Sequence, residues 1–197
     1  MRIALITLLW GFSLTACNGS DDTALDDTAS PAAQATGAAS PGSDTGAAAG
    51  ASARATIRDS SGRELGTVTL RDTVGGIAVA GTLQGLPPGT RAIHLHMTGL
   101  CEPPFESAGD HWNPTNRQHG TENSQGPHFG DLPNVTISTD SAVSVQMITP
   151  GGALRGTNAL LDTDGAAVVL HAQPDDNRTD PSGNAGDRIA CGAVTVS

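Results

Sequence analysis

The sequence predicts an all-β fold, a Greek-key β-sandwich or flattened barrel of about eight antiparallel strands, for residues 52–197. Three observations support this fold class. Apolar and polar side chains alternate in short runs, turn residues such as Gly62 and Gly75 separate the runs, and no stretch has the spacing of an amphipathic helix. Alternation with a period of two is typical of half-buried antiparallel strands. A domain of about 145 residues can also bury a sizeable core.

The expected strands follow one another along this domain. Alternation is clearest in residues 53–58, 64–71 and 76–83. The further strand-like runs are 91–97, 135–139, 142–148, 166–171 and 189–196. Because aromatic residues make up only 3% of the chain, the core has to be built from Val, Ile, Leu and Ala.

Residues 1–16 are typical of a bacterial export signal. Arg2 is the only charge, and the apolar run from residue 3 to residue 12 is too short to span a bilayer. The run leads to Leu14-Thr15-Ala16-Cys17, which resembles a lipoprotein cleavage site, so Cys17 would become the lipidated first residue. An ordinary secretion signal that contains a cysteine is the alternative.

Residues 17–51 then form a lipidated cysteine followed by a disordered tether, because they are rich in Ala, Gly, Ser, Thr and Asp and contain no aromatic residue. Lipidation of Cys17 would attach the protein to a membrane without a spanning helix. We therefore expect a lipid-anchored protein of the cell envelope. Asn18, where an aspartate would favour the inner membrane, favours the outer membrane, facing the periplasm.

The charge of the chain excludes two classes of partner. The formal net charge is −10, and all ten basic residues are arginines. A strongly acidic protein is repelled by nucleic acid and by anionic membrane surfaces, so neither is expected as a partner.

The histidines cluster in a way that favours a metal site. Five of the six lie between residues 94 and 131, and the sixth, His171, ends the run Val-Val-Leu-His. Scattered histidines are usually surface or core residues, but imidazole is also the commonest metal ligand in proteins. Residues two apart on a strand point to one face, so His94 and His96 would project together.

Several short motifs that contain histidine, aspartate or glycine follow one another along the domain. They are His94-x-His96, residues 107–114 around Asp110-His111-Trp112-Asn113-Pro114, His119-Gly120, residues 128–134 around His128-x-Gly130-Asp131, His171 and residues 183–192. Together they resemble the copper,zinc superoxide dismutase family over residues 52–197, and Cys101-Glu102-Pro103-Pro104 is similar to its bacterial branch. The resemblance implies a β-sandwich, an architecture that this family is known to have, with long metal-binding and active-site loops.

The resemblance also implies one copper and one zinc ion per chain. The copper ligands would be His94, His96, His111 and His171, and four imidazoles suit copper. The zinc ligands would be His111, His119, His128 and Asp131, a closed shell of the kind that structural zinc takes. His111 would bridge the two ions.

Asp175 and Arg188 complete the site that the resemblance implies. Asp175 would accept N–H bonds from His94 and His119 and fix the rings, whereas an exposed loop aspartate is the alternative. Arg188 would attract and orient a small anion beside copper, whereas a surface salt bridge with Asp187 or another carboxylate is the alternative.

The activity implied is dismutation of superoxide to oxygen and hydrogen peroxide. Catalysis would use a copper redox cycle, with His111 carrying a proton to the product and Arg188 binding the anion. Ala92, Met97, Asp110 and Trp112 depart from the family pattern and affect packing and local potential, but they remove no ligand. A non-enzymatic copper or zinc binding or delivery module with the same fold is the alternative, and a surface domain that the metals only stabilise is a third hypothesis. Both a monomer and a homodimer remain open.

The three cysteines divide into one in the export region and two in the folded domain. If Cys17 carries lipid, Cys101 and Cys191 remain as a pair, and an oxidising envelope allows them to form a disulfide. In the family this bridge ties the loop beside the metals to the last strand. Two free buried thiols are the alternative.

Overall fold

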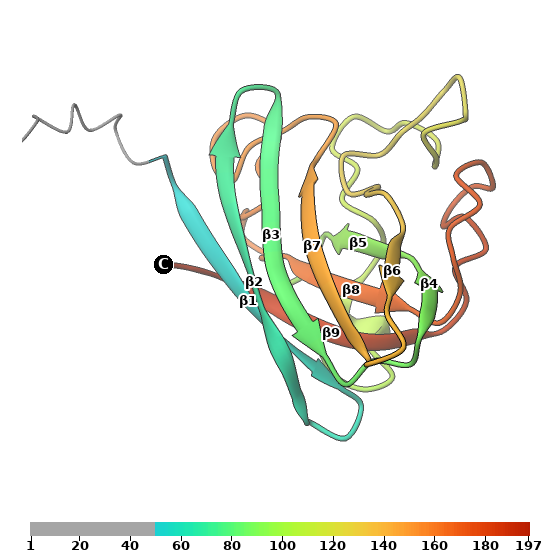
Figure 1. The fold of residues 1–197 in the computed structure, drawn as a ribbon. Helices are drawn as coiled ribbons and strands as arrows, with labels where there is room; N and C mark the ends of the chain where they lie inside the picture. Colours follow the sequence, from blue (N-terminus) through green and yellow to red (C-terminus); the bar gives the residue numbers. More distant parts are fainter. Residues whose placement is uncertain (1–49) are drawn as a thin grey trace, which may run out of the picture. The chain divides into compact units, whose positions relative to one another are not determined.

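The all-β fold is confirmed in the structure, a computed structural model that describes residues 50–197 (Figure 1). The strands are β1 Ser52–Asp59, β2 Glu64–Thr73, β3 Gly76–Gln84, β4 Gly89–Arg91, β5 Ile93–His96, β6 Val135–Ile137, β7 Ala142–Ile148, β8 Ala167–His171 and β9 Arg188–Val196, with one 3₁₀ helix, η1, at Glu106–Ala108. No helix of the described residues is long and apolar enough to cross a membrane. The export signal, Cys17 and most of the tether lie outside them.

Seven strands form one curled antiparallel sheet in the order β5-β8-β9-β1-β2-β3-β7, and β4 pairs with β6 in a second, two-stranded sheet. The first and last strands of the domain, β1 and β9, are neighbours in the larger sheet, as Figure 1 shows. The sheet curls around a large hydrophobic core to which most of its strands contribute. This half-barrel agrees with the Greek-key expectation.

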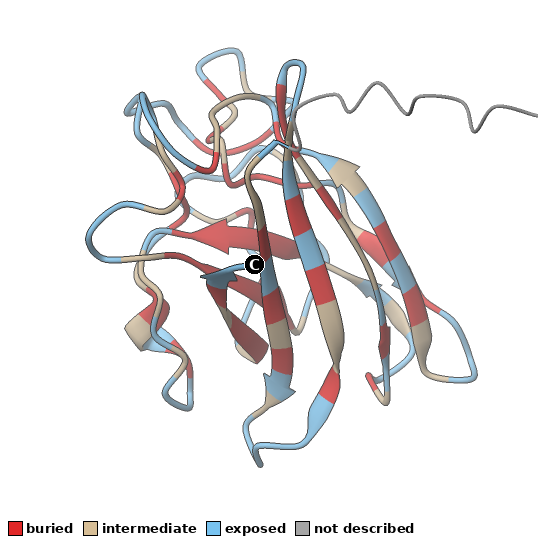
Figure 2. Cartoon of the chain, turned by 90° about the vertical axis from the view of Figure 1, so that its left-hand side faces the viewer, coloured by how far each residue is buried: buried red, intermediate tan, exposed pale blue. Residues whose placement is uncertain are grey.

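The strands form because their side chains alternate between this core and solvent. On β1, Ala53, Ala55 and Ile57 are buried, while Arg54 and Arg58 are exposed. Figure 2 shows the same alternation as red and pale blue bands along other strands. Each large apolar side chain buried in this way stabilises the fold by about 1.5–3 kcal/mol.

Strands β5 and β8 differ from the others because both of their faces are buried. Ile93 and Leu95 of β5 face the main core, so His94 and His96 face the opposite side. There they lie beneath the long loops, and neither histidine has any exposed surface. The sheet thus provides a rigid floor for the histidine cluster.

The strand expected at residues 91–97 is confirmed over Ile93–His96 as β5, but its first residue, Arg91, belongs to the separate strand β4. Arg91 of β4 pairs with Val135 of β6, whereas β5 pairs with β8. Between them the Ala92 N–H donates to the carbonyl of Gln173 at 2.9 Å, and the Ala92 carbonyl accepts from the His171 N–H at 3.0 Å. The chain therefore changes sheets at Ala92, a contact between distant segments that the sequence pattern does not reveal.

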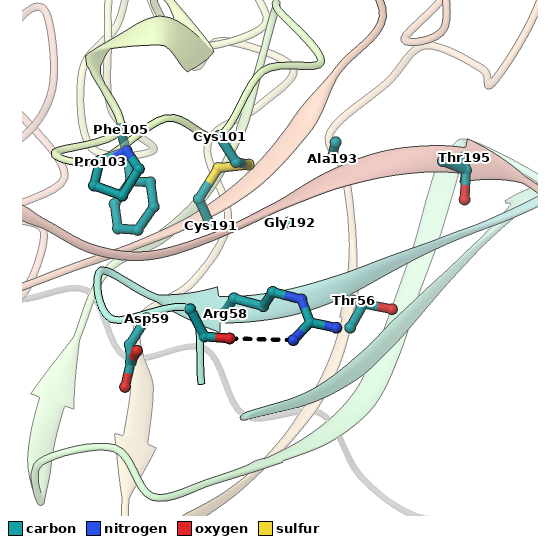
Figure 3. A pocket seen from close by; sticks show the side chains of 11 residues that line it. Thr56, Arg58, Asp59, Cys101, Pro103, Phe105, Cys191, Gly192, Ala193 and Thr195 are labelled. Atoms are coloured by element: carbon teal, nitrogen blue, oxygen red, sulfur yellow. Dashed lines mark hydrogen bonds between the residues drawn. A yellow bond between two sulfur atoms is a disulfide. The ribbon is translucent and has the colours of Figure 1, made fainter. Parts of the chain in front are cut away.

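Cys101 and Cys191 form the expected disulfide, so the alternative of two free thiols is wrong. The bridge joins β9 to the loop that carries η1, and Figure 3 shows it at the edge of a pocket of about 380 Å³. Beneath it a second, smaller core contains Phe105 and Ala108 of the loop and Val169 of β8. The disulfide and this small core fix the loop against the sheet.

Replacing both cysteines with alanine is expected to lower the free energy of unfolding by about 4–5 kcal/mol, since the bridge closes a long loop in the unfolded chain. The sequence separation of Cys101 and Cys191 is 90 residues. Urea denaturation would measure the change, and the reduced wild-type protein should match the double variant. A loss below about 1 kcal/mol would contradict this loop-closure account.

Candidate metal centre

The free edge of β5 brings the two groups of expected ligands together. His94 pairs with Asp131 and His96 pairs with His111 as isolated β-bridges. Residues around Asp131 and His111 therefore run beside β5, although both belong to the long loop between β5 and β6. Backbone pairing thus carries loop residues to the strand that holds His94 and His96.

Backbone hydrogen bonds fix this arrangement. The Leu95 N–H donates to the Gly130 carbonyl at 3.0 Å, and the Trp112 N–H donates to the Leu95 carbonyl at 2.8 Å. A side chain at position 130 would bring its Cβ within 2.2 Å of the Leu95 carbonyl oxygen. Glycine is therefore required here so that the two backbones can approach each other.

Four imidazoles, from His94, His96, His111 and His171, converge at the first of two clusters. One nitrogen of each ring lies within 4.8 Å of the others. Within the described residues, the buried nitrogens Nδ1 of His94 and Nε2 of His96, His111 and His171 have no hydrogen-bond partner. Buried polar atoms are nearly always satisfied, so four unpaired nitrogens at one point indicate a metal-binding site.

The opposite nitrogens of three of these rings are held by oxygen acceptors. Nδ1 of His96 lies 2.9 Å from the Gly109 carbonyl oxygen, and Nδ1 of His171 lies 3.3 Å from that of Gly186. Nε2 of His94 lies 2.8 Å from Oδ2 of Asp175. With the proton on the outer nitrogen, each ring directs its lone pair into the cluster, as metal-binding histidines do.

Burial keeps these rings neutral. It lowers the pKa of His94 to about 3 and that of His171 to about 4, and it lowers the pKa of His96 well below its ordinary value. Neutral imidazoles keep the lone pair that a metal ion needs. At neutral pH this cluster is therefore ready to bind a cation without first losing protons.

The second cluster is organised around Asp131. Its Oδ1 lies 2.9 Å from Nδ1 of His111, 3.0 Å from that of His119 and 3.2 Å from that of His128. Its Oδ2 accepts the backbone N–H groups of Gly120 and His128, both at 2.9 Å. Burial alone would raise the pKa of Asp131, but these hydrogen bonds hold that pKa far below its usual range. Asp131 is therefore an anion at neutral pH.

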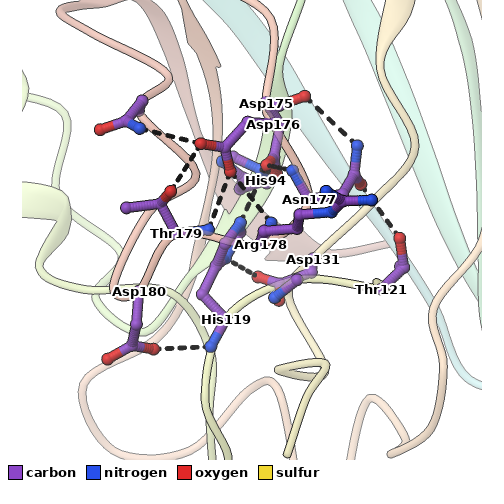
Figure 4. A network of polar contacts seen from close by, with 12 residues as sticks. His94, His119, Thr121, Asp131, Asp175, Asp176, Asn177, Arg178, Thr179 and Asp180 are labelled. Carbon is purple, nitrogen blue, oxygen red and sulfur yellow. Dashed lines mark hydrogen bonds and ion pairs between the residues drawn. The ribbon is translucent and has the colours of Figure 1, made fainter. Parts of the chain in front are cut away.

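Asp175 links the two clusters (Figure 4). Its Oδ2 faces Nε2 of His94 at 2.8 Å, and its Oδ1 faces Nε2 of His119 at 2.9 Å. The carboxylate is buried, so Asp175 is not the exposed loop residue of the alternative interpretation. Burial opposes a charge on His119, but hydrogen bonds to Asp131 and Asp175 raise its pKa to about 9. A metal bound at Nδ1 of His119 would have to displace a proton there.

The donor atoms fit two different ions. The first cluster offers four imidazole nitrogens, a set that suits copper. The second offers three imidazoles and one carboxylate, which is the closed four-coordinate shell of structural zinc. His111 belongs to both clusters, with Nε2 in the first and Nδ1 in the second.

Comparison with known proteins now decides the family. A sequence model of the family described as copper/zinc superoxide dismutase (SODC) matches residues 64–194. This protein belongs to the copper/zinc superoxide dismutase family. Its metals are accordingly copper and zinc. The two clusters supply donor atoms that suit these two ions.

Bacterial relatives support the assignment. Superoxide dismutase [Cu-Zn] 2 of Aquifex aeolicus (strain VF5) is 40% identical over 146 residues, which are 72% of this chain and 85% of the relative. Superoxide dismutase [Cu-Zn] of Caulobacter vibrioides is 39% identical over 148 residues, 73% of this chain and 85% of the relative. The crystal structure of a SOD-like protein from Bacillus subtilis matches with a TM-score of 0.68 and 36% identity, over 71% of this chain and 96% of that one.

Arg188 reaches the copper cluster because of a bulge in the sheet. Leu170 of β8 pairs with Ala190 of β9, but the next residue, His171, pairs with Arg188, so Ile189 is the extra residue. The Arg188 guanidinium donates to the carbonyls of Phe105 and Gly109, both at 2.8 Å. The backbone therefore holds Arg188. No salt bridge with Asp187 is seen among the described ion pairs, but the carboxylate of Glu106 lies 3.7 Å from the guanidinium.

A pocket of about 510 Å³ opens beside these groups and is lined by His111, His171 and Arg188. Arg178, which lies in the loop between β8 and β9, pairs with Glu122 and does not line the pocket. Arg117 is the second cationic residue that lines the pocket. The pocket thus adjoins two members of the first cluster, His111 and His171.

Sequence reasoning missed one aspartate that supports the second cluster. Oδ1 of Asp180 accepts the backbone N–H of His119 at 2.6 Å, from the loop between β8 and β9. Figure 4 shows this contact at the lower edge of the polar network. No sequence pattern marks Asp180 among the neighbouring aspartates, because its role depends on contact between distant loops.

Trp112 anchors the loop next to His111, the residue that both clusters share. Its indole Nε1–H donates to the Ala159 carbonyl at 3.1 Å, and its ring packs against Phe129. A side chain on Gly152 would collide with the indole, because its Cβ would lie 2.1 Å from a ring carbon. The indole ring of Trp112 therefore has both the space that Gly152 leaves and a hydrogen-bond acceptor.

Changing Trp112 to Phe is expected to lower the free energy of unfolding by about 1–2 kcal/mol, since one hydrogen bond and part of the buried ring are lost. Thermal or urea denaturation of the metal-loaded protein would measure it. Copper and zinc content should not change, because no ligand is removed. Loss of either metal in this variant would show that Trp112 positions His111 rather than only packing the loop.

Proposed function

We propose that this protein is an active superoxide dismutase of the cell envelope, converting two superoxide anions and two protons into oxygen and hydrogen peroxide. The observation that carries the proposal is the set of four buried, unpaired imidazole nitrogens beside a pocket that also contains Arg188. The relatives named Cu-Zn superoxide dismutase support the same activity.

The roles of the residues follow from their positions. His94, His96, His111 and His171 would hold copper, and His111, His119, His128 and Asp131 would hold zinc. When bound, copper supplies a one-electron redox couple, and zinc supplies a fixed structural charge. The Arg188 guanidinium binds and orients the anion, with its own position set by two backbone carbonyls.

Proton transfer is assigned to His111. Its Nε2 lies in the copper set, and the residue also lines the pocket through which the product leaves. His111 Nε2 takes up a proton in one half of the cycle and passes it to the departing peroxide in the other. Asp131 holds the same ring at Nδ1, and Asp175 holds the rings of His94 and His119.

The location in the envelope is supported by the sequence of the N-terminal region. The apolar run, the lipidation site at Cys17 and the following tether favour a lipid anchor. Radiolabelled fatty acid should enter the wild-type protein in bacteria and should not enter a Cys17→Ala variant. Labelling that persists in the variant would rule out Cys17 as the lipidated residue.

The activity is tested by loading the purified protein with one copper and one zinc per chain and measuring superoxide decay, with the zinc-only protein as control. Superoxide dismutases are among the enzymes known to reach the diffusional ceiling of about 10⁸–10⁹ M⁻¹s⁻¹, so copper-dependent turnover should approach that value. If both metals bind and turnover stays at the zinc-only background, metal binding or delivery becomes the function.

A further inference from the structure

The pocket over the copper cluster has an unusual balance of charge for a site that admits an anion. Two of its lining residues are cationic, Arg117 and Arg188. Four are acidic: Glu106, Asp110, Asp180 and Asp187. The chain as a whole carries a formal charge of −10, so the global field also repels anions. Local contacts around Arg188 therefore decide how well an anion is attracted.

One of the four acidic residues approaches Arg188 directly. Oε2 of Glu106 lies 3.7 Å from Nη2 of Arg188, within range of an ion pair but too far for a hydrogen bond. The Glu106 side chain is 74% exposed, whereas that of Arg188 is 14% exposed. An exposed carboxylate thus lines the pocket beside a nearly buried cation.

Glu106 is held there by the loop and is not needed to hold Arg188. It is the first residue of η1, and it follows Phe105, which is buried at a left-handed φ of 76°. Arg188 is already fixed by its bonds to the Phe105 and Gly109 carbonyls. Because a guanidinium has five N–H donors, these two bonds leave others free for an anion or for Glu106.

We propose that Glu106 competes with anions for the Arg188 guanidinium and thereby sets the affinity of the copper pocket for its anionic substrate. The proposal rests on the proposed function in that superoxide is the anion concerned. Removal of the Glu106 charge then strengthens anion binding without disturbing Arg188 or either cluster of ligands.

The test compares Glu106→Gln with Glu64→Gln in the copper- and zinc-loaded protein. Glu64 is also an exposed glutamate paired with an arginine, Arg58, but it does not line the pocket. Both variants change the net charge equally. Azide is the probe, titrated by the visible absorption of copper(II), and chloride-35 NMR line broadening of the zinc-only protein measures anion binding without copper.

At low ionic strength Glu106→Gln should lower the azide Kd roughly two- to fivefold and raise kcat/KM for superoxide by a similar factor, the effect of a unit charge about 4 Å away through water. High salt should reduce the difference. A Glu106→Asp variant, which keeps the charge but shortens the side chain, should fall between wild type and Glu106→Gln. Glu64→Gln should match wild type.

An unchanged azide Kd in Glu106→Gln, or an equal shift in Glu64→Gln, would overturn the proposal. The results also distinguish failure of the proposed function from failure of the role of Glu106. If azide and chloride bind more tightly to Glu106→Gln although no form turns over superoxide, the proposed function fails and the role of Glu106 stands. If wild type turns over superoxide while neither probe distinguishes Glu106→Gln, only the role of Glu106 fails.

Discussion

Replacing His96 with alanine is expected to remove copper from the protein and leave zinc in place. His96 contributes a buried Nε2 to the first cluster and no atom to the second. Loss of a hydrogen-bonding partner of a ligand typically costs 10–100-fold, so loss of the ligand itself should cost more than about 100-fold in copper affinity and in copper-dependent turnover. Metal analysis after dialysis, followed by a superoxide assay, measures both effects.

The matched variant is His128→Ala, which makes the same substitution in the other cluster. His128 contributes Nδ1 to the set around Asp131 and none to the first cluster. It should therefore lose zinc and retain the four copper ligands. If both variants lose the same metal, or if each loses both, the two clusters do not act as separate sites, and the division proposed for them is wrong.

The histidine clusters could be predicted from sequence because each depends on a short-range rule. His94 and His96 share a face since a strand repeats every two residues, and the fold buries both of them on that face. His111, His119, His128 and Asp131 belong to one loop, so the chain itself keeps them near one another. The disulfide between Cys101 and Cys191 followed from the resemblance and an oxidising compartment.

Features that depend on contacts between distant segments could not be predicted. The run at residues 91–97 breaks its alternation at Ala92-Ile93, but this break alone does not reveal that Arg91 pairs with β6 whereas Ile93 pairs with β8. The bulge at Ile189 decides that Arg188 faces His171, yet Ile189 looks like any strand residue. Glu106 likewise acquires a role only because Arg188, from the far end of the chain, lies beside it.

Asp131 explains why the long loop has a defined structure despite its lack of strands. A loop of this length normally costs more conformational entropy than its own contacts recover. Asp131 collects three imidazoles and two backbone N–H groups on one carboxylate. Its pairing with His94 also attaches the loop to β5. One residue therefore joins the loop to the sheet through its backbone and to the expected zinc ion through its side chain.

Changing Asp131 to alanine is accordingly expected to abolish zinc binding and to lower the free energy of unfolding of the metal-loaded protein by about 3–5 kcal/mol, as loss of one partner of a buried charged network does. Bound metal adds to the difference, since a free ligand at 1,000 times its Kd stabilises a protein by about 4 kcal/mol. Urea denaturation with and without a chelator separates the two contributions. The chelator should destabilise wild type strongly and the variant little.

Asp164→Ala is the control, because it removes the same charge from an exposed position outside both clusters. It should keep both metals, the response to chelator and nearly all of the stability. The comparison decides whether Asp131 is needed to bind zinc and to order the loop. If Asp131→Ala keeps zinc and loses stability only as Asp164→Ala does, His111, His119 and His128 hold the ion without it, and the order of the loop must come from backbone pairing along β5.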